Sequence, residues 1–164
     1  MAKVVSVHSK YSGVIVSKTD MRKLRDTLNR KVTEIREDLI EILCYIGEEC
    51  VKVARENGSY NDITGNLRSS IGYVVLYDGQ VVQQSQGKTY KGRKGNGAAG
   101  VPAAQALLSK LQAKFAWGLV LIVCAGMNYA AYVEAVRHKD VLTSAELRSD
   151  QLVKSLLSKL TTSA

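Results

Sequence analysis

The sequence has few of the residues from which most catalytic and metal sites are built. Only two of its 164 residues are histidines, His8 and His138, and only three are cysteines. Neither histidine has a cysteine or a second histidine at the spacing of zinc ligands, so we expect no metal site. No Gly-x-Ser-x-Gly motif is present to build a hydrolase nucleophile. We therefore predict a protein that is not an enzyme and that needs no cofactor.

The three cysteines predict no disulfide. Cys44 and Cys50 lie six residues apart in a strongly helical pattern, which places them about 120° apart around the axis and about 9 Å along it. Side chains so placed cannot bridge each other. We expect Cys44, Cys50 and Cys124 to be small buried hydrophobic residues of a protein in a reducing compartment.

Long hydrophobic runs are also lacking. The most apolar run, residues 117–127, contains two glycines and is shorter than the roughly 20 residues needed to cross a bilayer. It predicts a buried strand instead. Because the first residues carry no secretory signal, we expect synthesis in the cytoplasm and no membrane partner.

The length and the composition, with 46% apolar and 23% charged residues, are typical of one globular domain. We predict an N-terminal arm over residues 1–18, with a short strand at 14–16, and a single α+β domain over 19–164.

The strongest structural signal is one long helix over residues 19–57. Its apolar residues recur every three or four positions, which is the spacing of a helical stripe. Asp20, among other residues, can cap its start, and Asn57-Gly58 can end it. At a rise of 1.5 Å per residue it would be about 55 Å long and would extend past the rest of the domain.

The sequence predicts a small antiparallel sheet after this helix. Asp78-Gly79 joins two alternating runs, at 71–77 and 80–83, as the turn of a hairpin. Further elements are predicted as helices over 101–115, 129–136 and 144–160 and a strand over 117–125. This order predicts an α+β fold, with the long helix and the shorter ones packed on one face of an antiparallel sheet.

The net charge of +8 is concentrated in two segments, 18–31 and 88–94. Two interpretations stay open: solvated basic surfaces, or contact with nucleic acid, an acidic partner or a neighbouring subunit. The candidate contact residues are Arg22, Lys23, Arg25, Arg30, Lys31, Lys88, Lys91, Arg93 and Lys94.

The second basic segment lies in a glycine-rich loop over residues 85–100, which we predict to be mobile. Gly95-x-Gly97-x-x-Gly100 matches a dinucleotide-binding motif, but no strand precedes it and no acidic residue follows at the required spacing. The loop could follow a phosphate backbone without reading its sequence, or become ordered on a neighbouring subunit.

Two short motifs carry most of the functional information. The first, residues 62–71, reads DITGNLRSSI, and the second, 126–134, reads GMNYAAYVE. In the first, Asp62 or Thr64 can cap a single helical turn, and Gly65 allows a sharp bend. We also predict an ion pair between Arg68 and Glu134.

Together with the preceding long helix, these motifs resemble the bacteriophage tail-component family, the neck and tail-completion proteins between the head-tail connector and the tail tube. The residues that carry the resemblance are Asp62, Thr64, Gly65, Leu67, Arg68, Ser70, Tyr129, Ala130, Tyr132 and Glu134. The chain departs from the family pattern at Ile63, which separates Asp62 from Thr64. It departs again at 135–137 and at 140–143, where the customary glycine and Pro-Phe-Leu are replaced.

The resemblance implies a structural protein of a phage or prophage virion, assembled in the bacterial cytoplasm. It implies a ring, expected to have six subunits, whose partners are copies of the chain, the connector and the tail-tube proteins. Nonspecific DNA contact would be secondary. The alternative, from the basic segments alone, is a small nucleic-acid-binding module.

Overall fold

The computed structural model describes residues 20–163, with side chains as far as Ser158. The predicted arm and its strand at 14–16 lie outside these residues. The chain divides into two compact units between Leu39 and Ile40, inside the first helix.

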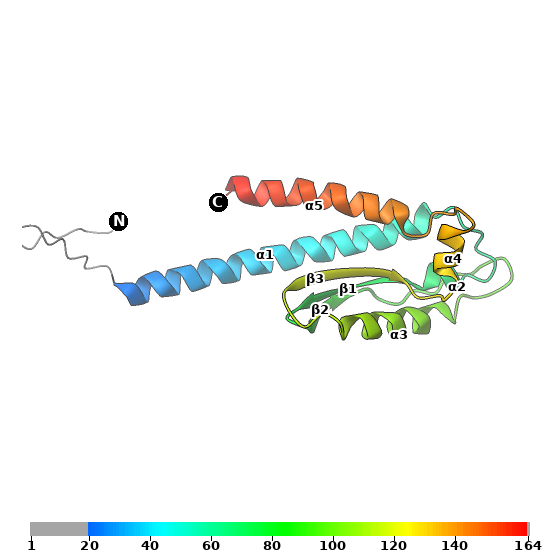
Figure 1. The fold of residues 1–164 in the computed structure, drawn as a ribbon, viewed down its shortest axis with the longest axis horizontal. Coiled ribbons are helices and arrows are strands. Elements are labelled where there is room, and N and C mark those ends of the chain that lie inside the picture. The colour runs from blue at the N-terminus through cyan, green and yellow to red at the C-terminus, as the bar shows by residue number, and fades with distance from the viewer. Residues whose placement is uncertain (1–19, 164) are drawn as a thin grey trace, which may run out of the picture. The chain divides into compact units, whose positions relative to one another are not determined.

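The first helix, α1, spans Met21–Glu56 (Figure 1). Its start is capped by Asp20, whose carboxylate accepts hydrogen bonds from the backbone N–H groups of Arg22, at 3.1 Å, and Lys23, at 3.4 Å. Such caps satisfy N–H groups that have no partner inside the helix. The predicted long helix is confirmed.

The second unit contains a three-stranded antiparallel sheet of β1 (Ile71–Tyr77), β2 (Gln80–Gln84) and β3 (Leu119–Ala125), in the order β2-β1-β3. The predicted hairpin is confirmed: Asp78 and Gly79 both have positive φ angles, 47° and 77°, as in the turns that match strand twist. The register shifts between Val75 and Leu76, so β2 bulges there.

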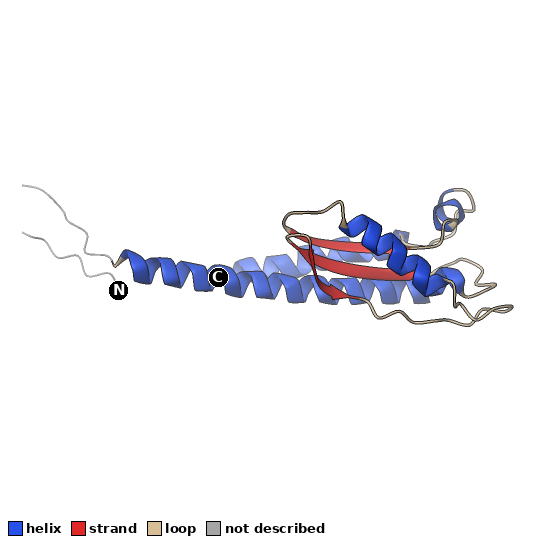
Figure 2. Ribbon diagram, turned by 90° about the horizontal axis from the view of Figure 1, so that it is seen from below, coloured by secondary structure: helices blue, strands red, loops and turns tan. Residues whose placement is uncertain are grey.

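The sheet lies between helices on both of its faces (Figures 1 and 2). On one face, alternate residues of β1, such as Tyr73, join a core with α1 from Ile40 onward and with α5 (Thr143–Ser163). On the other face, Val74 and Leu76 pack with Leu108 of α3 (Gly100–Gln112).

The prediction that helices cover one face only is therefore wrong. β1 is the central strand and is buried from Ile71 to Leu76. Because its side chains are apolar on both faces, each face needs a cover. The α+β class itself, with a long helix on a small antiparallel sheet, is confirmed.

A close approach of α1 to the sheet explains one helical glycine. A Cβ atom at Gly47 would lie 2.4 Å from the ring of Tyr73. The same ring directs its hydroxyl to α1, where it donates a 2.8 Å hydrogen bond to Glu48. Packing and one partly buried hydrogen bond thus hold this part of α1 against the sheet.

Two short helices connect these layers. α2 (Asn66–Ser69) leads into β1, and α4 (Ala130–Ala135) follows β3. Both lie at the same end of the sheet, whereas the turn between β1 and β2 lies at the opposite end (Figure 1). This arrangement brings the two sequence motifs to one end of the second unit.

Candidate functional site

The two motifs, more than fifty residues apart in the chain, surround one cavity of about 750 Å³. From the first motif and the residues before it, Tyr60, Asp62 and Leu67 line this motif cavity, and from the second, Tyr129 and Val133. Two basic residues, Arg137 and Lys139, also line it. Apolar walls with a few charges are suited to the capture of a side chain or a short segment.

The first motif forms a tight turn around Gly65, whose φ is +80°. The backbone N–H of Asn66 donates a 3.4 Å hydrogen bond to the hydroxyl of Thr64. The N-cap position of α2 is Gly65, and no side chain caps the helix, so the prediction that Asp62 or Thr64 caps it is wrong. Leu67 is buried at 5% exposure, and the Ser69 hydroxyl donates to the Gly65 carbonyl at 2.7 Å. The turn is therefore held by its own side chains.

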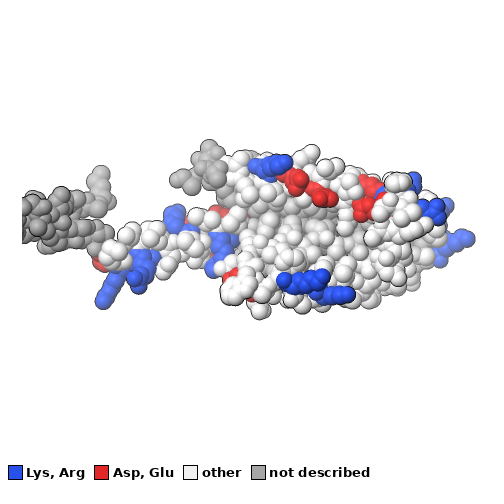
Figure 3. Space-filling model, in the orientation of Figure 1, with Lys and Arg blue, Asp and Glu red and all other residues white. Residues whose placement is uncertain are grey.

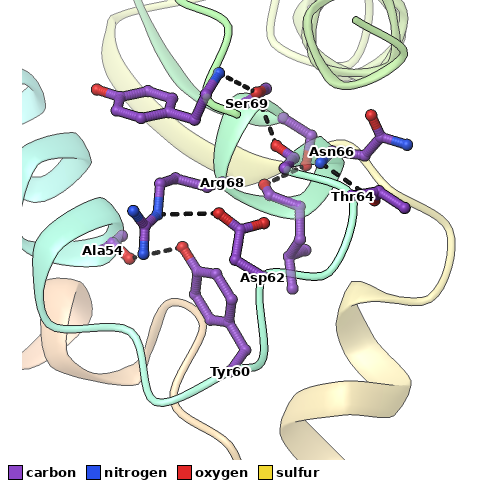
Figure 4. Close-up of polar contacts among 11 residues, drawn as sticks. Ala54, Tyr60, Asp62, Thr64, Asn66, Arg68 and Ser69 are labelled. Carbon is purple, nitrogen blue, oxygen red and sulfur yellow. Dashed lines mark hydrogen bonds and ion pairs between the residues drawn. The ribbon is translucent and has the colours of Figure 1, made fainter. Parts of the chain in front are cut away.

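Arg68 forms an ion pair with Asp62 inside this turn. Its Nε lies 3.3 Å from Asp62 Oδ2, and the two side chains are 34% and 13% exposed. Figure 4 shows the two side chains pointing toward each other beside Tyr60, whose hydroxyl donates to the Ala54 carbonyl at 3.2 Å. Burial raises the pKa of Tyr60, although its hydrogen bond with Arg68 and the charge of Arg68 oppose the shift.

The predicted ion pair between Arg68 and Glu134 is wrong, because both partners are engaged elsewhere. Glu134 Oε1 accepts hydrogen bonds from the N–H groups of Leu142 and Thr143, each at 2.9 Å, and from the Thr143 hydroxyl at 2.7 Å. Glu134 therefore caps the start of α5. Burial raises its pKa, but the hydrogen bonds outweigh that effect and lower the pKa below the ordinary value.

Ser70 joins the first motif to the second. Its hydroxyl donates to the Leu67 carbonyl at 2.8 Å and accepts a hydrogen bond from the N–H of Met127 at 3.3 Å. Its carbonyl accepts a 2.8 Å hydrogen bond from the N–H of Gly126. Ser70 is fully buried, and so it holds the end of β3 against the start of β1.

The other residues of the second motif divide between core and surface. Ala130 is buried at 6% exposure, whereas Tyr129 and Tyr132 are 37% and 51% exposed. Tyr129 reaches the motif cavity, and the Tyr132 ring contacts Arg137, with 5.9 Å between the ring centre and the guanidinium carbon.

The glycine-rich loop packs against the first motif. The N–H groups of Lys94 and Gly97 donate to the carbonyls of Ile63 and Thr64 at 2.7 and 2.9 Å, and the N–H of Tyr90 donates to the Ser69 hydroxyl at 2.7 Å. A Cβ atom at Gly97 would lie 2.3 Å from the Tyr90 carbonyl oxygen. The glycines of the loop were predicted to make it mobile. They instead allow the backbone of the loop to pack directly against the backbone of the first motif.

Tyr90 is surrounded by cations that the sequence did not group together. Arg55, Lys88 and Arg68 lie 5.2, 5.3 and 5.8 Å from its ring centre. Arg55, which the sequence analysis missed, also donates a 2.7 Å hydrogen bond from Nη2 to the carbonyl of Ile71. Lys88 and Arg68 therefore contribute to packing around an aromatic ring.

The predicted contact cations fall in the two separate units. In the first unit, Arg30 and Lys31 lie 4.0 and 2.8 Å from Glu34, and Arg22, Lys23 and Arg25 are exposed. In the second unit, Lys91, Arg93 and Lys94 are exposed on the glycine-rich loop. Figure 3 shows that the basic side chains on the face in view lie in several places rather than in one patch.

Exposed apolar side chains gather at the turn between β1 and β2. Trp117 is 85% exposed and Phe115 is 40% exposed. They are attached to the turn, since the N–H of Asp78 donates to the Gly118 carbonyl at 2.9 Å and the Asp78 carboxylate accepts from the Gly118 N–H at 2.8 Å. β2 is exposed along its whole length. We use the name hairpin patch for β2 together with Phe115 and Trp117.

The cysteines have no disulfide partners: all three lie in the described part of the chain and are free. Burial raises the pKa of each thiol, in the case of Cys124 to about 11. Within residues 20–163, no His, Cys, Asp and Glu side chains are grouped three or more together in a way that could hold a metal ion. Among the helices described, none has a stretch long and apolar enough to cross a membrane.

The second unit is thus an α+β domain with a motif cavity at one end and an exposed aromatic patch at the other. Comparisons with family models, with curated proteins and with solved structures found no match to the chain.

Proposed function

We propose that the protein is a noncatalytic component of a phage virion, a tail-completion or neck adaptor that forms a ring between the head-tail connector and the tail tube. The observation that supports it best is the hairpin patch, where Trp117 is 85% exposed. A tryptophan left in water is typical of a residue that anchors a protein contact.

The second unit has two unlike surfaces that a head-to-tail contact would bring together. The hairpin patch extends from β2 to the turn at one end of the sheet, and the motif cavity of about 750 Å³ lies at the other end, beside α2 and α4. A contact between unlike surfaces of identical chains closes into a ring when its rotation permits. β2 adds unpaired backbone groups at the sheet edge. Four of the residues that carry the family resemblance line the receiving surface: Asp62, Thr64, Leu67 and Tyr129.

The test measures ring formation by the full chain, with light scattering after size exclusion and with electron microscopy, alone and with a connector protein. We expect Trp117→Ala to abolish rings or connector binding while the fold is unchanged, because this side chain is exposed. Tyr129→Ala, at the opposite surface, should do the same. Tyr45→Ala is the matched control, an aromatic residue on α1 that is 50% exposed. A wild-type chain that neither forms rings nor binds connector or tail proteins would refute the proposal.

The nucleic-acid-binding module is the second candidate, supported by Lys91, Arg93 and Lys94, which are exposed on a loop held by backbone hydrogen bonds. A filter-binding titration separates the two functions. A module should bind DNA at moderate salt with an affinity that falls steeply as salt rises. An adaptor should bind weakly, with no effect of Trp117→Ala.

A further inference from the structure

The first unit exposes a stripe of large apolar side chains along α1. Met21, Leu24, Leu28, Val32 and Ile35 are between 42% and 66% exposed. We name these five residues the apolar stripe. A helix with one continuous apolar face in water is a helix without its packing partner.

The stripe has a regular period. Its residues repeat after eleven positions, so Met21 is followed by Val32 and Leu24 by Ile35. Eleven residues occupy three helical turns, and the repeat therefore keeps the stripe nearly parallel to the helix axis. In the second unit the same repeat reaches Ile46, which is buried in the protein's own core. The exposed segment thus has the pattern of a helix that packs along its whole length.

Charge changes sign along the same helix. Residues 20–31 contain five basic and two acidic residues, whereas residues 32–41 contain four acidic and one basic. One acidic residue of the second group, Glu34, already contacts Arg30 and Lys31 within the helix. The remaining acidic residues lie on the part of the helix that follows.

We propose that Met21–Leu39 pairs in antiparallel orientation with the same segment of a second copy of this chain. A parallel pair would place the basic segments of the two copies beside each other. An antiparallel pair places each basic segment beside the acidic segment of the other copy, so that opposite charges meet. The occupant of the stripe is therefore a second copy, and charge determines its direction.

The apolar spacing agrees with this orientation in one register. When the two-fold axis passes close to Val32, Leu28 lies opposite Ile35 of the second copy, and Leu24 lies opposite Leu39. The stripe then pairs with itself without a polar residue in its centre. Such a contact uses the same surface on both copies.

This pairing goes beyond the adaptor function and does not depend on it. A junction between head and tail has a direction, with unlike ends facing the head and the tail. A pair with a two-fold axis perpendicular to that direction has two identical ends and does not fit it. The pair therefore belongs to the free protein and must open before assembly.

Sedimentation velocity of the full chain over a range of concentrations tests the pairing. We expect a dimer whose dissociation constant rises at least tenfold when salt increases from 50 to 500 mM. Leu28→Glu with Val32→Glu should give a monomer at every concentration. Both side chains are exposed, so the fold of the second unit provides a check by circular dichroism. Asn29→Ala is the matched control, because this residue is exposed beside the stripe and its substitution changes no charge, so the dimer should be unchanged.

Single cysteines with a short crosslinker determine the direction of pairing. Val32→Cys should crosslink two copies, whereas Leu24→Cys should not, because two such residues in an antiparallel pair are about 22 Å apart along the axis. Crosslinking of both variants would show a parallel pair and overturn the proposal. The wild type measures the background from Cys44, which is partly exposed.

The other outcomes are also decisive. If the wild type is a monomer and Leu28→Glu does not change its sedimentation, the pairing is refuted. This holds equally if residues 1–19 or another protein cover the stripe. The failure of this proposal is distinct from that of the adaptor function: Trp117→Ala should abolish rings and leave the dimer, whereas the double stripe variant should abolish the dimer.

Discussion

The cap that Glu134 provides for α5 gives a measurable prediction. Its Oε1 accepts hydrogen bonds from three backbone N–H groups, those of Val141 at 3.4 Å and of Leu142 and Thr143 at 2.9 Å, and one from the Thr143 hydroxyl. Thr143 is the first residue of the 21-residue helix α5, and Val141 and Leu142 directly precede it. Removing the carboxylate leaves them without this acceptor.

The magnitude follows from what a helix cap contributes. Losing one destabilises a protein by about 0.5–2 kcal/mol, and the interaction of a carboxylate with the helix dipole adds about 0.3–1 kcal/mol. We expect Glu134→Ala to lower the free energy of unfolding by about 2 kcal/mol. Glu134→Gln keeps an acceptor oxygen but not the charge, so its loss should be about 1 kcal/mol. For a chain of this size, 2 kcal/mol corresponds to a decrease in Tm of roughly 4–8 °C.

The pH dependence follows from the lowered pKa of Glu134. Its ordinary value is 4.5, and hydrogen bonds to the ionised form hold it lower in the folded protein. A group of this kind stabilises the fold fully above its unfolded pKa, and the contribution disappears as pH falls through the folded pKa. The difference between wild type and Glu134→Gln should be complete at pH 7 and should decrease below pH 4.5.

Urea denaturation followed by circular dichroism, at pH 7 and at points down to pH 3, measures both effects. Glu146→Gln is the control, since it removes a carboxylate from the first turn of the same helix and should cost only about 0.3–0.5 kcal/mol. If Glu134→Gln is as stable as wild type at pH 7, or if its deficit is the same at pH 3, the carboxylate does not cap α5.

Three further predictions concern packing, charge and reactivity. Gly65→Ala should destabilise the protein by at least about 3 kcal/mol, because its Cβ would lie 1.8 Å from a backbone oxygen. The control is Gly118→Ala, which has the same φ of +80° but open space around it. This substitution should cost about 1–2 kcal/mol. Equal losses in chemical denaturation would contradict this explanation. Substitution of Asp62 and Arg68, singly and together, should reveal a coupling of about 1 kcal/mol; independent effects would mean that their ion pair contributes nothing. Iodoacetamide should label Cys44 more than roughly tenfold faster than the two buried cysteines, as followed by peptide mass spectrometry, and labelling at one common rate would contradict their burial.

Periodic patterns in the sequence predicted most of the helices and strands. The 3.6-residue spacing of apolar residues located α1, and Asp78-Gly79 located the hairpin, because both signals act within a few residues. The second cover of the sheet was missed although β1 is apolar at every alternate position on both sides. A strand buried on two faces was treated as a strand buried on one.

The candidate site was predictable in its residues and not in its contacts. The motifs identified Gly65 and Ser70 from sequence alone, but the partner of Arg68 was wrong. The sequence does not show whether Arg68 contacts Asp62, six residues earlier, or Glu134, more than sixty residues later. The fold determines both distances. The backbone contacts of the glycine-rich loop were missed for a similar reason, since composition alone does not distinguish a glycine that moves from a glycine that fits.

The packing of that loop has a consequence for how the protein can change. Between Tyr90 and Gly100 the backbone is the structural part, because its N–H groups and its glycines meet the turn around Gly65. The cations of the loop, Lys91, Arg93 and Lys94, are exposed. The backbone of the loop is therefore the part that its packing constrains, and the surface charge of the protein can be changed at these three positions without altering the glycine contacts.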